Sequence, residues 1–335
     1  MNTELSIYSS LRIMIMKKLF AFVVICLFAF SSAIAQNKIE RETFVYSVKD
    51  TLELKFDKFV DNSVPYQGKR PVMIYVHGGG FSVGSRINAL QDKYCKHFAA
   101  KGFISISINY RLGIKTGQQA SQDVVMNAVN IAVEDLFDAT GFILKNADKW
   151  NVDKEKIIVS GGSAGAVTCL TAEYDICSEG KYASWVPKGF NFAGVVSHAG
   201  SVVVAQDTLT WKKTPCPILL MHGDKDMQVP FDSWKLEGNI YAGSNYIHKQ
   251  FIKSDFPHWL YIEEGADHIV ALKPLQYNFG EIDTFIDRFV LKGEHAMVKT
   301  TWKDKEPGSM EKMFDIVPLY MIGWDKTDEE VEAGK

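Results

Sequence analysis

The sequence predicts an α/β fold with a mostly parallel central sheet that is covered by helices on both faces. Short apolar runs typical of buried strands alternate along the chain with longer stretches typical of helices, and this alternation favours parallel strands. Most of the runs end in glycine or polar residues, where the functional loops of such a sheet are expected. With 47% hydrophobic residues among 335, the chain has enough apolar side chains for one large core or two small ones.

The individual elements follow from these patterns in chain order. Apolar residues alternate through residues 42–59 on both sides of Lys49-Asp50, which predicts an N-terminal β-hairpin. Buried strands are predicted at residues 71–76, 103–108, 156–160, 192–197, 217–221 and 259–262. Helices are predicted at residues 87–101, 122–150 and 277–291, with a further helix after Gly165.

Residues 1–35 are predicted to be a secretory signal peptide and not part of the fold. Two consecutive lysines precede the apolar run 19–30, which is short for a membrane span, and Ala33-Ile34-Ala35 provides a cleavage site. Met16, directly before the lysines, is an alternative start. We therefore expect an exported protein, periplasmic or secreted, with no stable membrane insertion after cleavage. An N-terminal anchor that is never cleaved is the alternative.

The charge balance and the cysteines limit the partners that the chain can have. A net charge of −3, without a basic cluster interleaved with aromatic residues, argues against a nucleic-acid partner. No Cys/His cluster has the spacing of metal ligands, so neither a metal nor a cofactor is expected. Export permits disulfides, but free buried thiols fit the local sequence equally well. The cysteines concerned are Cys95, Cys169, Cys177 and Cys216.

The pattern Gly161-Gly162-Ser163-Ala164-Gly165 stands between a predicted strand and a predicted helix. A Gly-x-Ser-x-Gly sequence in this context is typical of the nucleophile elbow, a tight turn that exposes a serine hydroxyl above the sheet. The turn needs glycine because larger side chains would meet neighbouring backbone. Taken alone this pattern is a weak signal, since other glycine-rich turns also produce it. Ser163 is therefore a candidate nucleophile whose partners must be sought elsewhere in the chain.

A second glycine run, His77-Gly78-Gly79-Gly80-Phe81, follows the first predicted strand after the hairpin. Acyl transfer creates an oxyanion, which is best stabilised by backbone N–H groups that already point into the site. Consecutive glycines allow the chain to turn in this way without placing a side chain over the acyl group. The run therefore predicts an oxyanion hole, although a simple glycine turn after a strand is the alternative.

An acid and a base follow Ser163 in the order expected for such an enzyme. Asp226 is the preferred acid because it lies beyond a strand end with room to reach a histidine, whereas Asp224 is expected to brace the turn. His268, after the last predicted strand, is the preferred base. His198 and His258 are the competing histidines.

Four motifs together resemble the α/β-hydrolases, and most closely the bacterial carboxylesterases and lipases related to hormone-sensitive lipase. The resemblance covers about residues 71–291 and is specific to the family. The motifs are His77-Gly78-Gly79-Gly80-Phe81, Asn109-Tyr110-Arg111-Leu112, Gly161-Gly162-Ser163-Ala164-Gly165 and His222-Gly223-Asp224-Lys225-Asp226-Met227-Gln228-Val229-Pro230.

The resemblance implies a role for particular residues of this chain. It implies Ser163 as the nucleophile, with Asp226 and His268 as the other triad members. The amides of Gly79, Gly80 and Ala164 are the implied oxyanion donors. In this family the arginine of Asn109-Tyr110-Arg111-Leu112 is structural, and we expect Arg111 to pair with Asp135.

The chain also departs from the family pattern. We assign residues 37–292 to the hydrolase domain and 293–335 to a C-terminal extension without a predicted role. Too few residues separate Gly165 from the next strand for a large cap domain. The stretch 234–258, between acid and base, is longer than expected and rich in Tyr, Trp, Asn and Gly. We expect it either to form a wall of the substrate site or to be a surface helix.

These features lead to one preferred function and two alternatives. The preferred one is an exported serine hydrolase of carboxylic esters, with a small-molecule or carbohydrate ester as substrate and short-chain, acetyl or feruloyl acyl groups. An amidase, formamidase or serine peptidase would use the same triad. A non-catalytic binding module on the hydrolase fold is the third interpretation, against which the intact set of candidate residues argues.

Overall fold

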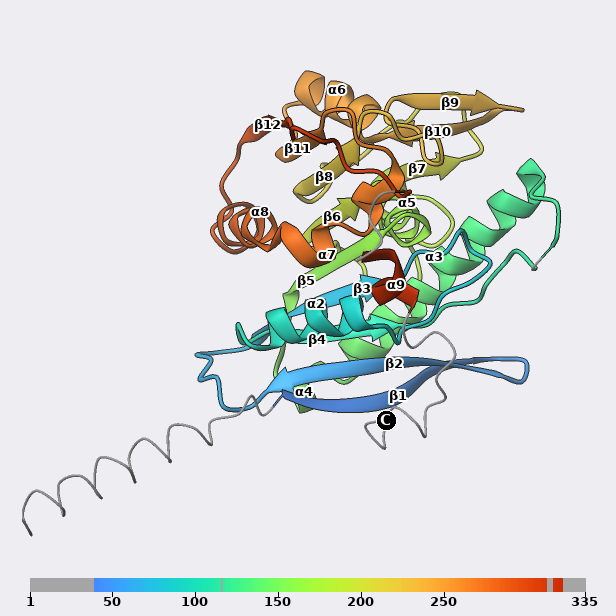
Figure 1. Ribbon diagram of the computed structural model, residues 1–335. Helices are drawn as coiled ribbons and strands as arrows, with labels where there is room; N and C mark the ends of the chain where they lie inside the picture. The colour runs from blue at the N-terminus through green and yellow to red at the C-terminus, as the bar shows by residue number, and fades with distance from the viewer. Residues whose placement is uncertain (1–38, 116, 312–315, 322–335) are drawn as a thin grey trace, which may run out of the picture. The chain divides into compact units, whose positions relative to one another are not determined.

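The computed structural model describes residues 39–115, 117–311 and 316–321, so the expected signal peptide lies outside the described residues. Its main feature is a nine-stranded sheet (Figure 1) with the strand order β1-β2-β4-β3-β5-β6-β8-β11-β12. Strands β1 and β2 form an antiparallel hairpin and β2 pairs antiparallel with β4. All other neighbours are parallel. The strands are β1 (Ile39–Lys49), β2 (Leu52–Asp61), β3 (Arg70–Val76), β4 (Ile104–Ile108), β5 (Val152–Gly162), β6 (Gly194–His198), β8 (Ile218–Gly223), β11 (His258–Glu263) and β12 (Met297–Trp302).

This sheet confirms the predicted α/β class, the N-terminal hairpin and the position of every predicted strand. Alternate residues of the parallel strands face two different cores, as the pleat of a strand requires. In β3, for example, Ile74 packs into one core and Tyr75 into the other. Because both faces are covered, the strands are apolar throughout and not only at every second residue, which is why they were recognisable in the sequence.

Helices cover each face of the sheet. One core contains residues of α3 (Gln122–Lys145), α5 (Ala164–Ser178) and α6 (Ser244–Ser254). The other contains residues of α2 (Ala89–Ala99), α8 (Phe279–Phe285), the π-helix η2 (Ile286–Leu291) and the short helix α9 (Ile316–Met321).

The boundaries of three helices differ from those predicted from the sequence. In two cases the residue that caps the helix explains the difference. Helix α2 begins at Ala89 because the side chain of Asn88 accepts a hydrogen bond from the Gln91 amide at 2.9 Å and so caps the helix. The long helix ends at Lys145, since Asn146 leaves the helical conformation, and a separate turn α4 (Ala147–Trp150) follows. The stretch 277–291 continues from α8 into η2, and its apolar spacing does not distinguish these two helix types.

Two further elements were not predicted. A small antiparallel sheet consists of β7 (Ser201–Val204), β10 (Asn239–Gly243) and β9 (Ser233–Leu236), and α6 follows it directly. Strand β12 pairs in parallel with β11, so the described part of the C-terminal extension continues the central sheet. The structural unit therefore does not end at residue 292, where the sequence suggested a domain boundary.

Candidate active site

Ser163 lies in the sharp turn between β5 and α5, where its backbone has φ 54° and ψ −124°. Such a conformation is costly for a residue other than glycine and persists only where the surroundings enforce it. The tight packing is evident at the flanking glycines. A Cβ atom on Gly161 would lie 2.4 Å from the Gly165 carbonyl carbon, and one on Gly165 would lie 2.0 Å from the Val76 oxygen. The small residues of the elbow motif are thus required by the geometry.

In the structure, the ring of His268 is hydrogen-bonded to the Ser163 hydroxyl. The ring atom Nε2 lies 2.8 Å from the Ser163 Oγ, although the two residues are 105 positions apart. His268 begins the short 3₁₀ helix η1 (His268–Ala271), which follows the end of β11 and is capped by the Asp267 side chain. His268 is buried apart from 5% of its surface, so the hydrogen bond to the serine is protected from competing water.

Asp226 lies on the other side of the histidine ring. Its Oδ2 is 2.6 Å from His268 Nδ1, while Oδ1 accepts hydrogen bonds from the amides of Gln228 and Val229 at 2.8 and 2.9 Å. Burial raises the pKa of Asp226, but hydrogen bonds from His222 and His268 outweigh it and hold the pKa well below its ordinary value. The carboxylate is therefore charged and able to orient His268 with its Nδ1 protonated.

The competing residues lie elsewhere. Asp224 Oδ1 accepts a hydrogen bond from the Gly265 amide at 2.5 Å, so its carboxylate braces the loop that leads to His268. His258 Nε2 contacts His248 Nδ1 at 2.6 Å. The ring of His198 is fully buried, and burial lowers its pKa to about 3. In the described part of the chain, neither ring is hydrogen-bonded to the Ser163 hydroxyl; His198 instead accepts the Ser163 amide with its backbone carbonyl at 2.9 Å.

A second histidine, His222, contacts the carboxylate of Asp226, and the sequence did not predict a role for it. His222 Nε2 lies 3.3 Å from Asp226 Oδ2 and 3.2 Å from the Val229 oxygen, and Nδ1 lies 2.8 Å from the Ser244 Oγ. With Ser244 as the donor to Nδ1, the Nε2 hydrogen is directed at the acid. In the sequence, His222 is only the first residue of the motif at 222–230. Nothing in the neighbouring residues indicates that its ring turns toward Asp226.

The glycine run supplies amides next to Ser163. Gly79 and Gly80 have φ angles of 110° and 60°, values that glycine adopts without strain. Within the residues that the structure describes, neither of their amides donates to a backbone or side-chain acceptor. Ala164 is the first residue of α5, and an amide in that position has no acceptor inside its own helix. These three N–H groups are available to a ligand at Ser163, which is the chemistry of an oxyanion hole.

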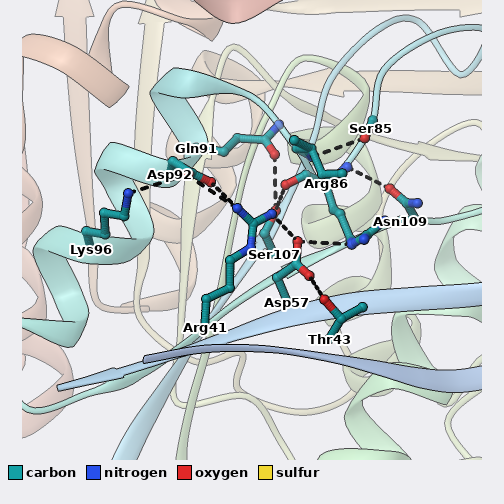
Figure 2. A network of polar contacts seen from close by, with 11 residues as sticks. Arg41, Thr43, Asp57, Ser85, Arg86, Gln91, Asp92, Lys96, Ser107 and Asn109 are labelled. Atoms are coloured by element: carbon teal, nitrogen blue, oxygen red, sulfur yellow. Dashed lines mark hydrogen bonds and ion pairs between the residues drawn. The ribbon is translucent and has the colours of Figure 1, made fainter. Parts of the chain in front are cut away.

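The loop after the glycines is held by a buried polar network that reaches back to the hairpin. Figure 2 shows Asp57 of β2 between the guanidinium groups of Arg41 and Arg86, at 2.6 and 3.0 Å. The Arg86 amide donates to Asn109 Oδ1 at 2.6 Å, and its carbonyl accepts from Ser107 Oγ at 2.9 Å. This network joins three strands to the segment that directly follows Phe81.

The Asn109-Tyr110-Arg111 stretch supports the same region from the end of β4. The expected pairing of Arg111 with Asp135 is confirmed: Arg111 donates to the buried carboxylate from Nε at 2.9 Å, from Nη2 at 2.7 Å and from its backbone amide at 2.8 Å. Tyr110 stacks on the His77 ring with centroids 4.3 Å apart, and its hydroxyl donates to the His77 carbonyl at 2.9 Å. The anchored loop thus holds the start of the glycine run.

A cavity of about 370 Å³ opens beside Ser163. Its lining includes the glycine run, His268 and Gln228, and its remaining wall is mainly apolar: Ala271, Leu272, Met310, Val317, Tyr320 and Met321. Four of these residues belong to the C-terminal extension, which had no predicted role. None comes from 234–258, so the expectation that this stretch forms the wall is wrong for this cavity. That stretch contains most of β9, all of β10 and the helix α6. The alternative expectation, a surface helix, therefore describes only part of it.

The four cysteines that the structure describes are free, and the described residues offer no metal site. Cys95, Cys169, Cys177 and Cys216 are all buried thiols, and burial raises the pKa of Cys95 to about 12. Among residues 39–115, 117–311 and 316–321, no group of three or more His, Cys, Asp or Glu side chains could hold a metal ion. A search of the same residues finds no helix with the length and apolar character of a membrane span.

Known proteins that are similar to this chain include several esterases. Residues 61–202 match the family BD-FAE, an α/β-hydrolase esterase family. Gut esterase 1 of Caenorhabditis elegans is 29% identical over 124 residues, which cover 37% of this chain and 21% of that protein. Esterase B1 of Culex pipiens is 30% identical over 138 residues, covering 40% and 24%. The chain thus spans less than a quarter of the length of either relative.

Solved structures extend the likeness to most of the chain. A thermophilic esterase from the planctomycete Thermogutta terrifontis, Est2, superposes with a TM-score of 0.54 at 17% identity, covering 74% of this chain and 92% of the other. Its apo form gives a TM-score of 0.55 at 19% identity, covering 76% and 95%. Because the sheet topology and these superpositions agree, the chain has the α/β-hydrolase fold.

Proposed function

We propose that this protein is a serine hydrolase that cleaves carboxylic esters through an acyl-enzyme. The observation that carries the proposal is the continuous hydrogen-bonded chain from Asp226 through His268 to Ser163, which ends beside a cavity lined by Gly79 and Gly80. The amides of these two glycines have no acceptor among the described residues. Nucleophile, base and orienting acid in this geometry are the parts that acyl transfer needs. The esterases among the similar proteins support the same activity.

The reaction follows from the positions of these atoms. His268 Nε2 accepts the proton of the Ser163 hydroxyl as Oγ attacks the ester carbonyl carbon. The amides of Gly79, Gly80 and Ala164 hold the negative oxygen of the tetrahedral intermediate. Asp226 stabilises the imidazolium that His268 becomes. His268 then returns the proton to the leaving alcohol oxygen, and a water molecule repeats the sequence to release the acid.

The lining of the cavity indicates the substrate class. It contains no Asp, Glu, Lys or Arg side chain in the described part of the chain, so nothing there would offset the cost of desolvating a charged acyl group. We infer an uncharged acyl chain short enough for about 370 Å³, or a carbohydrate-borne acyl group such as acetyl or feruloyl. Structures of the Thermogutta esterase with propionate and butyrate bound support short acyl chains.

We further propose that the protein acts outside the cytoplasm. The support is the N-terminal pattern of two lysines, an apolar run and an Ala-x-Ala site. A mature protein beginning at Gln36, identified by mass in the periplasm or medium, is the expected result. A full-length protein that stays with the membrane would contradict it.

The activity is tested by comparing an ester with the anilide of the same acid. We expect hydrolysis of p-nitrophenyl acetate and butyrate at least 100-fold faster than of the matching anilides. We also expect a fluorophosphonate to label Ser163 stoichiometrically, as the Thermogutta protein phosphorylated by paraoxon suggests. Faster anilide cleavage would favour the amidase alternative. Absence of labelling would favour a non-catalytic binding module.

The apolar wall predicts how acyl-chain length is selected. Replacing Val317 with tryptophan adds bulk inside the cavity, so butyrate should lose at least tenfold in kcat/KM relative to acetate, since excluding one or two methylenes changes binding by about 1–3 kcal/mol. The rates for a series of p-nitrophenyl esters measure this ratio. Val48→Trp, at an exposed position of the hairpin, is the matched control. An unchanged ratio in folded Val317→Trp would exclude this wall as the selector.

A further inference from the structure

A tyrosine of the C-terminal extension reaches the start of the glycine run. The hydroxyl of Tyr320, in α9, accepts a hydrogen bond from the Gly78 amide at 2.8 Å, across 242 positions of sequence. Tyr320 is 5% exposed and packs in the core that also contains α2 and α8. The packed ring therefore fixes the position of the hydroxyl. Tyr320 also borders the cavity at Ser163.

Two tyrosine hydroxyls thereby hold one peptide group. The carbonyl of His77 and the N–H of Gly78 belong to the same planar peptide, because the peptide bond does not rotate. Tyr110 donates to that carbonyl at 2.9 Å, and Tyr320 accepts from that N–H at 2.8 Å. The plane is fixed at both ends, so the direction in which the chain enters Gly78 is determined by these two side chains.

The next peptide carries the first of the oxyanion amides. The Gly78 carbonyl shares its plane with the Gly79 N–H, and this carbonyl lies 2.7 Å from His77 Nδ1. A Cβ atom on Gly78 would come within 3.2 Å of the Ser163 Cβ and 2.8 Å of the Gly162 oxygen. Gly78 is thus pressed against the nucleophile turn, and any rotation there redirects the Gly79 amide.

We propose that Tyr320 is a positioning residue for the oxyanion hole. The inference rests on the proposed function and goes beyond it by giving the C-terminal extension a part in the chemistry. Glycines have no side chains that could hold their backbone, and a glycine run is conformationally free on its own. Oxyanion donors work only if they are already aimed before the reaction. Tyr320 supplies that constraint from outside the region that matches the BD-FAE family, which ends at residue 202.

The test is Tyr320→Phe, which removes the acceptor oxygen and keeps the ring. We expect kcat for p-nitrophenyl butyrate to fall about tenfold to 100-fold, while KM changes less than threefold, because the amides act on the transition state and not on the bound ester. A trifluoromethyl ketone forms a tetrahedral adduct, in which Ser163 Oγ adds to the carbonyl carbon and His268 takes the proton. Its affinity should fall by the same factor as kcat.

Tyr174→Phe is the matched control. The Tyr174 hydroxyl also accepts a backbone amide, that of Thr210 at 3.0 Å, but Tyr174 does not border the cavity at Ser163. This variant should keep its kcat and its affinity for the ketone. Tyr110→Phe releases the other end of the same peptide, and it should lower kcat in the same direction as Tyr320→Phe.

The outcomes separate this inference from the proposed function. If wild-type protein hydrolyses the ester, and folded Tyr320→Phe keeps kcat and ketone affinity within twofold, the hydroxyl is only structural and the inference is overturned while the function stands. A lowered Tm without a change in kcat has the same meaning. If the wild type labels with a fluorophosphonate but does not turn over the ester, labelling should still slow tenfold in Tyr320→Phe. A wild type without either reaction overturns both.

Discussion

Replacing Ser163 with alanine is expected to lower ester turnover by about 10⁴- to 10⁶-fold without unfolding the protein. The hydroxyl is the atom to which His268 is hydrogen-bonded at 2.8 Å, so the substitution removes the atom that forms the acyl-enzyme in the proposed mechanism. Residual activity would come from the oxyanion amides and from substrate binding alone. Steady-state rates on p-nitrophenyl butyrate, together with circular dichroism, measure both parts of the expectation.

Ser178→Ala is the control for this experiment. Ser178 ends the same helix that begins after Ser163, and its hydroxyl donates to the Asp175 carbonyl at 3.4 Å. Turnover should stay within twofold, and a fluorophosphonate should still label this variant. If Ser163→Ala retained turnover within tenfold of wild type, Ser163 could not be the nucleophile.

Replacing Asp226 with asparagine is expected to lower kcat by roughly 10⁴-fold, the loss measured for the corresponding change in a serine protease. The carboxylate accepts hydrogen bonds from His268 Nδ1 and from the amides of Gln228 and Val229. An asparagine can satisfy these amides with its oxygen, but its NH₂ group then faces His268 and favours the wrong tautomer. The fold should survive while the histidine loses its ability to take the serine proton.

Asp224→Asn is the matched comparison, because it removes the same charge two residues earlier. Asp224 contacts the Gly265 amide and not the histidine, so this change should cost about 1–2 kcal/mol of stability with a small effect on kcat. Thermal unfolding and steady-state kinetics of the two variants distinguish the roles. A folded Asp224→Asn enzyme that is slower than Asp226→Asn would exchange them.

The sequence by itself determined those features that constrain several neighbouring residues at once. The strands could be recognised because burial on both faces makes them continuously apolar, and the hairpin because its residues alternate around Lys49-Asp50. The turn at Ser163 could be recognised because its geometry excludes a Cβ atom at Gly161 and Gly165. In each case the physical requirement falls on a few neighbouring residues and therefore leaves a pattern in a short stretch of sequence.

The order of the strands then explains why the candidate residues could be paired only as a hypothesis. Ser163, Asp226 and His268 each follow a strand of the parallel sheet, so they share one edge of it. Proximity to that edge does not by itself choose between Asp226 and Asp224. Only the direction of each side chain does so, and that direction depends on the loop that Asp224 braces through Gly265.

Only the tertiary structure decided what surrounds the site. His222 turns toward Asp226, the hairpin residue Asp57 holds the loop after the glycines, and Tyr320 binds the Gly78 amide. The cavity wall comes from the C-terminal extension and not from 234–258. These contacts join residues that are up to 242 positions apart. They arise from tertiary packing and from the direction of individual side chains, which impose no periodicity or spacing on the sequence of either partner.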